Sequence, residues 1–197
     1  NDGRFVAFTS SATNLVVPTG GYAQAFQKDL VTGEVTLASS SAAGVIGNAD
    51  AYRTIISSDG RYVGYFSTAT NLHPNATAGR YQVFRKEMPA HTGGSTPIML
   101  VSADKDGVQG DNDSRSADIT DNGTYVVFNS YAANLDTNAS SGTYYQIFRK
   151  NTTTGEVKVV SWTSAGGEAD TDCYHPVITP DGRYVAFHSD ATNLVAA

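Results

Sequence analysis

The segment at residues 180–194 reads PDGRYVAFHSDATNL, and it decides the fold because versions of it occur four times in the chain. The other copies begin at Asp2, Asp59 and Asn122 and end at the Asn-Leu pairs of residues 14–15, 71–72 and 134–135. Their turn glycines lie at positions 3, 60, 123 and 182, a period of about 60 residues, and self-similarity on this scale is typical of repeat architectures. The chain is therefore expected to be built from repeated units.

Each Asp-Gly or Asn-Gly pair stands directly before a run of aromatic and β-branched residues. This order predicts a hairpin with a type I′ turn, in which both central residues take positive φ. The run after Gly182 predicts a strand that is apolar on both faces, since Val185 and Phe187 alternate with Tyr184 and Ala186. Such a strand has to be covered on both sides.

Three other strands are expected in each unit: a short first strand such as 174–179, a third such as 144–150 and a fourth such as 156–162. A four-stranded antiparallel blade, stacked between similar blades, covers both faces of its second strand, and this arrangement is a β-propeller. A β-sandwich or a β-solenoid is the alternative. A sandwich favours a cleaner in-and-out alternation, however, and a solenoid favours a shorter period.

The fold class is thus all-β, with about three blades in one domain. We expect residues 1–197 to divide into a partial blade (1–39), two complete blades (40–102 and 103–162) and a second partial blade (163–197). Propellers close with about four to eight blades, so a second copy, or a missing part of the chain, is expected to complete a ring of about six. Self-association through blade edges is one expected partnership.

The repeat pattern DGRYVAF, then ATNL, then FRK, then TGE resembles the TolB-like, WD-repeat-like propeller repeats of secreted and periplasmic bacterial proteins, over essentially the whole chain. The resemblance implies a six-bladed propeller as the commonest form, interaction rather than catalysis, and an extracellular or periplasmic location. Many members carry an Asp-Thr-Asn-Gly loop and then an Asp before the Phe of strand three. This chain keeps only residues 136–138 of that loop, and it places Gln24, Gln82 and Gln146 where the second Asp would be.

Composition narrows the classes of partner. The formal net charge is −6 and the pI is about 5.0, which argues against nucleic acid because phosphate binding needs a basic face. No apolar run approaches the roughly 20 residues of a membrane span. The single cysteine, Cys173, is expected to be a small buried residue rather than a nucleophile.

The candidate site is a set of acidic residues that precede the first strand of three units at the same spacing. They are Asp50, Asp111, Asp113, Asp170 and Asp172. Because the first strand of a blade is innermost, Asp50, Asp113 and Asp172 are predicted to form a ring at a mouth of the central channel. That ring could bind a cation such as Ca²⁺ or a basic group. The alternative is that each Asp caps its own turn through side-chain hydrogen bonds to the backbone.

No nucleophile elbow, P-loop or paired-carboxylate motif can be read, and no cofactor other than Ca²⁺ is suggested. The leading functional hypothesis is an exported, non-catalytic binding or scaffold module that presents a face or rim to a protein or glycan. Self-assembly into a closed ring or a filament is the alternative. A propeller hydrolase is a third reading, which would need acids or metal ligands converging on one face.

Overall fold

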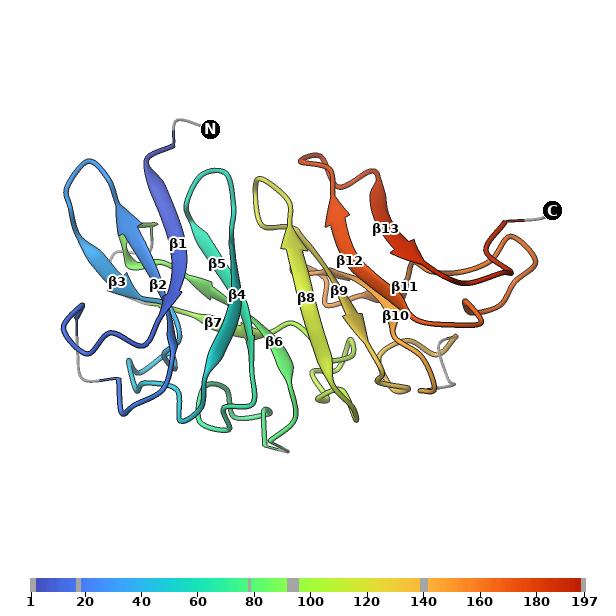
Figure 1. Ribbon diagram of the computed structural model, residues 1–197, viewed down its shortest axis with the longest axis horizontal. Coiled ribbons are helices and arrows are strands. Elements are labelled where there is room, and N and C mark those ends of the chain that lie inside the picture. Colours follow the sequence, from blue (N-terminus) through green and yellow to red (C-terminus); the bar gives the residue numbers. More distant parts are fainter. Residues whose placement is uncertain (1–2, 17–18, 78, 92–95, 139–141, 196–197) are drawn as a thin grey trace.

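The computed structural model describes residues 3–16, 19–77, 79–91, 96–138 and 142–195. Within them the chain forms β-strands and one short 3-10 helix, η1 (Pro89–His91). The strands make four antiparallel sheets that stand side by side along an arc (Figure 1). The loop at residues 88–96, between β6 and β7, contains η1, and its residues 92–95 lie outside the described part of the chain.

Each sheet is a meander of successive strands, as a propeller blade requires. The first blade has three strands, β1 (Phe5–Ser10), β2 (Gln24–Asp29) and β3 (Val35–Leu37), which take the places of the second, third and fourth strands of a complete blade and are named so below. The second has four, β4 (Ala51–Ile56), β5 (Tyr62–Ser67), β6 (Gln82–Glu87) and β7 (Ile98–Leu100). The third has β8 (Ser114–Ile119), β9 (Tyr125–Ser130), β10 (Gln146–Asn151) and β11 (Val157–Val159), and the fourth has β12 (Cys173–Ile178) and β13 (Val185–Ser189). The predicted four-stranded antiparallel blades are confirmed.

The first strands of the blades are the inner strands. β4 contacts β8 and β8 contacts β12, so the three line one concave surface, and they stand next to one another in Figure 1. The acidic segments lead into the lower ends of these strands in that view, whereas the glycine turns connect their upper ends to the second strands. The channel side of the arc is therefore built from β4, β8 and β12.

The prediction of type I′ turns is wrong. Gly60 takes a φ of 72°, but Asp59 is not among the non-glycine residues with positive φ, and the same holds for the pairs at 122–123 and 181–182. The backbone N–H of Gly60 instead donates to the carbonyl of Ser57, and Oδ1 of Asp59 accepts from the backbone N–H of Arg61. The Asp side chain therefore holds a longer turn in which only the glycine needs the left-handed conformation.

Adjacent blades pack through a contact that is repeated along the chain. The first aromatic residue of each second strand lies against the turn glycine of the next blade: Phe5 against Gly60, Tyr62 against Gly123, and Tyr125 against Gly182. A methyl group on Gly123 would lie only 2.2 Å from Cδ2 of Tyr62, so no larger residue fits at this distance. Separate apolar clusters fill the three junctions, which explains why the second strands are apolar on both faces.

Two buried lysines also link the blades. Nζ of Lys86 donates to the carbonyls of Ser40 (3.0 Å) and Ser41 (2.7 Å) in the first blade. Nζ of Lys150 does the same to the carbonyls of Ala103 and Asp104 in the second blade, at 2.7 and 2.9 Å. Burial lowers the pKa of each ammonium to about 8. The sequence alone favours solvated charge on the outer strands for Lys86 and Lys150, and this expectation is wrong for both, since they are 1% and 4% exposed.

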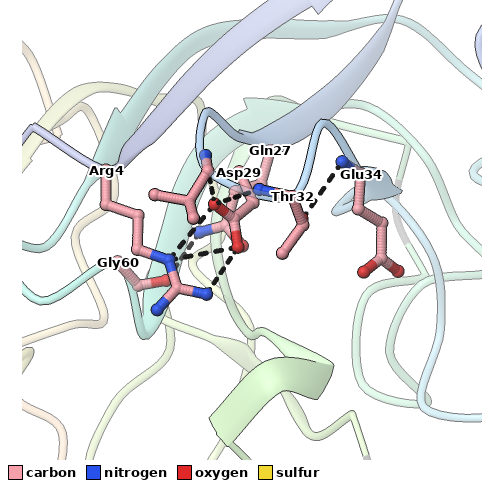
Figure 2. Close-up of polar contacts among 7 residues, drawn as sticks. Arg4, Gln27, Asp29, Thr32, Glu34 and Gly60 are labelled. Carbon is pink, nitrogen blue, oxygen red and sulfur yellow. Dashed lines mark hydrogen bonds and ion pairs between the residues drawn. The ribbon is translucent and has the colours of Figure 1, made fainter.

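Figure 2 shows the polar side of the first junction. Nε2 of Gln27 donates to the carbonyl of Gly60 in the second blade at 2.6 Å. Within the first blade, Arg4 donates from Nε and Nη2 to the carboxylate of Asp29, which also accepts from backbone N–H groups of the following turn. The Arg4 guanidinium, with help from those N–H groups, holds the pKa of Asp29 well below its usual range. The strand end is thereby fixed to its turn.

Candidate functional site

Asp50, Asp113 and Asp172 each stand just before an inner strand and hold two neighbours. Oδ1 of each accepts a backbone N–H from the residue that precedes the third strand of the previous blade. These donors are Ala23 (2.7 Å), Tyr81 (3.1 Å) and Tyr145 (2.7 Å). Oδ2 accepts from the side chain two positions later, which is Tyr52, Arg115 or Tyr174. The three carboxylates thus connect blades, and do not simply cap their own turns.

Asp111 and Asp170 have different neighbours. Oδ1 of Asp111 accepts from the N–H of Ala133, and Asp170 accepts from both the N–H and the hydroxyl of Thr192. Asn48 takes the same role in the second blade. Among the described residues, no three Asp, Glu, His or Cys side chains are grouped as a metal ion would need. Calcium binding at the channel mouth stays a prediction.

The glutamines that replace the second family Asp also have a structural role. Nε2 of Gln24, Gln82 and Gln146 donates to a carbonyl of the segment that leads into the next inner strand, at 3.1, 3.2 and 3.0 Å. Oε1 of each accepts from a buried serine hydroxyl at the end of the fourth strand. An amide can donate and accept at once, which a carboxylate cannot do. Each of these glutamines therefore joins two loops through one side chain.

Sequence reasoning missed a band of large side chains that runs across the inner strands beside the acidic residues. This mouth band consists of Tyr52, Tyr81, Arg115, Tyr131, Tyr145 and Tyr174. Tyr52 and Tyr81 have ring centroids 6.0 Å apart, and Cζ of Arg115 lies 4.3 Å from the Tyr81 centroid. Tyr131 stacks on Tyr145 at 3.7 Å, and Tyr145 meets Tyr174 at 6.0 Å. The signal was present for every band member except Tyr131: the others stand two positions after each Asp or just before one of the glutamines 24, 82 and 146.

The third blade interrupts the aromatic character of the band. One band residue on the first strand of each of three blades pairs with a residue on the second strand. The pairs are Tyr52 with Phe66 in the second blade, Arg115 with Asn129 in the third, and Tyr174 with His188 in the fourth. Asn129 is only 3% exposed, and its Oδ1 has no hydrogen-bond partner among the described residues. Nε of Arg115 is likewise buried without a partner, although its side chain is 40% exposed. Arg115 and Asn129 thus place two buried polar atoms, Nε and Oδ1, without a partner among the described residues at the centre of the band.

The phenols of Tyr52, Tyr131, Tyr145 and Tyr174 stay protonated at neutral pH. The hydrogen bond to Asp172 raises the pKa of Tyr174 to about 12, and the bond to Asp50 raises the pKa of Tyr52. Burial raises the pKa of Tyr131 and of Tyr145. Burial also raises the pKa of the Cys173 thiol beside them, which disfavours a reactive thiolate. The site therefore offers neutral donors and aromatic faces.

A hollow of about 430 Å³ lies one residue further along the inner strands. Each strand has a bulge there, and its residue takes a left-handed φ: 49° at Arg53, 34° at Ser116 and 48° at His175. Such a conformation costs about 1–2 kcal/mol for a residue other than glycine. Nη1 of Arg53 lies 3.2 Å from Nδ1 of His175, so side chains of the second and fourth blades meet across the concave surface.

Several solved structures are similar to this chain in fold. TolB from Acinetobacter baumannii is 18% identical over 93% of this chain and 34% of its own, with a TM-score of 0.52. A putative TolB from Agrobacterium tumefaciens is 18% identical over 95% of this chain and 56% of its own, with a TM-score of 0.51. The chain has the β-propeller fold of TolB. Tricorn protease is also similar, with 10% identity, a TM-score of 0.54, and coverage of 93% of this chain and 14% of its own.

The expected resemblance to TolB-like propellers is thus confirmed for the fold, which is what similarity at this identity establishes. The chain spans less than two thirds of the length of each of these structures. No family model matches the sequence, and no curated protein matches it. Within the described residues, the structure has no helix of the length and apolar character that a membrane crossing demands.

Proposed function

We propose that this propeller is an exported, non-catalytic binding module that uses its mouth band to bind a segment of a partner protein. The observation that carries the proposal is a pair of contact runs that together span three blades, one from Tyr52 through Tyr81 to Arg115 and one from Tyr131 through Tyr145 to Tyr174. Tyrosine and arginine are the residue types that most often dominate binding energy in protein interfaces. Tyr52 is 38% exposed, so the band is open to a partner.

Arg115 stands at the centre of the proposed interface. Its guanidinium is held between the Tyr81 ring and the carboxylate of Asp113, so its orientation is fixed before a partner arrives. A fixed side chain loses little conformational entropy on binding. The Arg115 side chain is 40% exposed, so a peptide carbonyl or carboxylate would accept from the outer face of its guanidinium.

Two observations support a non-catalytic role. The three inner carboxylates already accept hydrogen bonds from the backbone and from band side chains, and the Cys173 thiol is buried. The competing class is hydrolysis, since tricorn protease is among the similar structures, although the match covers 14% of that protein. Export rests on the resemblance of the repeat to propellers of secreted and periplasmic bacterial proteins.

The test is a screen of the purified chain against a peptide display library and a glycan array. Selected peptides are expected to lose about tenfold in affinity on Arg115→Ala or Tyr174→Ala, the effect of one lost contact of about 1.4 kcal/mol. The matched control is Arg183→Ala, because Arg183 is also an exposed arginine beside a tyrosine but lies at the turn end of the fourth blade. Peptides insensitive to the band variants, or binding of glycans alone, would refute the proposal.

Self-assembly is the second candidate function, and one observation favours it. Among the described strands, β1 pairs only with β2 and β13 pairs only with β12, so each presents an edge that could pair with another copy. Light scattering behind a sizing column separates the cases. A species near twice the 20.8 kDa chain mass supports a closed ring of two copies, very large species support a filament, and a monomer excludes assembly.

A further inference from the structure

A hollow of about 690 Å³ lies away from the channel at the outer strand β11 of the third blade. Its walls are the turn at residues 104–106, the loop at residues 134–138, residues of β11 and the side chain of Trp162. A volume of this size falls within the usual range of ligand sites in proteins. The mouth band does not use it.

The same hollow is present one blade earlier, but with different chemistry. There the turn consists of Ser41, Ala42 and Ala43, and Ile98 stands on the outer strand. Isolated bridges at the ends of the fourth strands show that Trp162 takes the place of Ala103 in the second blade and of Ser40 in the first. The hollow is therefore present at the second and at the third blade, and of these two only the one at the third blade has an acidic turn and an indole ring.

The hollow has an excess of negative charge. Four carboxylates line it, from Asp104, Asp106, Asp136 and Glu156, against the two ammonium groups of Lys105 and Lys158. Each lysine pairs with its neighbouring carboxylate at the surface, Lys105 with Asp106 at 2.8 Å and Lys158 with Glu156 at 3.0 Å. Exposed pairs of this kind are weak and exchange readily with other charges. Asp104 and Asp136 form no ion pair in the part of the chain described.

The walls are held in place before any ligand binds. Oδ1 of Asp104 accepts the N–H groups of Asp106 and Val108, and Nζ of Lys150 donates to the Asp104 carbonyl. On the opposite wall, Oδ2 of Asp136 accepts the N–H of Val159 in β11 at 2.9 Å. A site that is already ordered loses less entropy on binding than a mobile one.

We propose that this hollow binds an arginine or lysine side chain from a basic segment of a partner protein. The cation stacks on the face of Trp162, which is 38% exposed, and its N–H groups donate to the carboxylates around it. The excess of carboxylates favours a cation over a neutral sugar. This site is separate from the channel mouth, so it would give the module a second point of contact with its partner.

The chain contains a single tryptophan, so its fluorescence reports on this hollow. The probe is an acetylated hexa-arginine peptide, with hexaglutamate and maltohexaose as comparison ligands. Hexa-arginine is expected to change the fluorescence of Trp162 saturably, with an affinity that falls as salt is raised. Hexaglutamate and maltohexaose are expected to cause no saturable change.

Variants separate this site from general attraction between a cationic peptide and an acidic protein. Asp106→Asn with Glu156→Gln is expected to weaken hexa-arginine binding about tenfold, as the loss of two charged contacts implies. The matched control is Asp190→Asn with Glu34→Gln, since both residues are exposed and Glu34 occupies the position of Glu156 in the first blade. The proposal is overturned by an equal loss in both double variants, by no saturable change with hexa-arginine, or by a saturable change with maltohexaose instead.

Discussion

Tyr62 and Tyr184 occupy the same position of the repeat, yet 9% of Tyr62 is exposed against 63% of Tyr184. The turn of the third blade covers Tyr62, and Cζ of Arg85 lies 4.1 Å from its ring centroid. Beside the Tyr184 ring lies the neighbouring guanidinium of Arg183, whose Cζ is 5.3 Å from the ring centroid. The same motif is therefore a core residue in one blade and a surface residue in another. Burial of a repeat residue depends on the next blade, as expected where each unit contacts only its neighbours.

The largest expected effect is the truncation of these two rings. Tyr62→Ala should lower the free energy of unfolding by about 3–4 kcal/mol, because it leaves a cavity at a packed junction. Tyr184→Ala should lower it by less than about 0.5 kcal/mol, as an exposed surface substitution does. Urea denaturation followed by circular dichroism measures both. A large loss for Tyr184→Ala would show that another copy covers its ring, and would favour self-assembly.

Gly123 lies at a packed junction between blades and Gly3 does not, although their φ angles are nearly the same, 70° and 68°. Both Gly→Ala variants meet the left-handed strain of about 1 kcal/mol. Gly123→Ala also forces a methyl group against the Tyr62 ring. A methyl group added to Gly3 would have no atom of the described structure within 4 Å. We expect Gly123→Ala to be the more destabilising by about 1–3 kcal/mol in the same urea assay. Equal losses would mean that Tyr62 can move aside, contrary to the tight packing of the junction.

The buried lysine of the second blade predicts a pH dependence. The pKa of Lys86 is lowered to about 8 from an ordinary 10.5, so between these pH values the unfolded chain binds more protons than the folded one. The free energy of unfolding should therefore rise with pH across this window, by at most about 1.4 kcal/mol per pH unit from this group.

Lys86→Met should remove the part of the rise that Lys86 contributes and leave the part from Lys150, whose pKa is also lowered to about 8, and urea denaturation at several pH values measures the difference. Lys28 holds the same repeat position in the first blade, where its ammonium donates to Gly33 of its own turn. Lys28→Met is thus the matched control and should keep the wild-type pH profile. If the profile is unchanged in Lys86→Met, its ammonium is hydrated in solution and the junction is looser than the structure describes.

Sequence reasoning found the strands because the repeat places turn glycines, aromatic runs and Thr-Gly-Glu turns at a constant spacing. It also located Asp50, Asp113 and Asp172 at the start of the inner strands. It did not find the partners of those carboxylates, since Ala23, Tyr81 and Tyr145 belong to the preceding blade and lie 27 to 32 residues away. Alignment of the repeats to one another conceals such contacts, because each crosses from one unit to the next.

The sequence by itself determined the repeat unit, the antiparallel order of its strands and the propeller class, because these depend on turn chemistry and local apolar patterns. Only the tertiary structure decided which residues are buried, which lysines link blades, and how Tyr52, Arg115 and Tyr174 form one band. The physical reason is that these properties belong to the junctions between blades. A junction forms when two units stack, and neither unit specifies it alone.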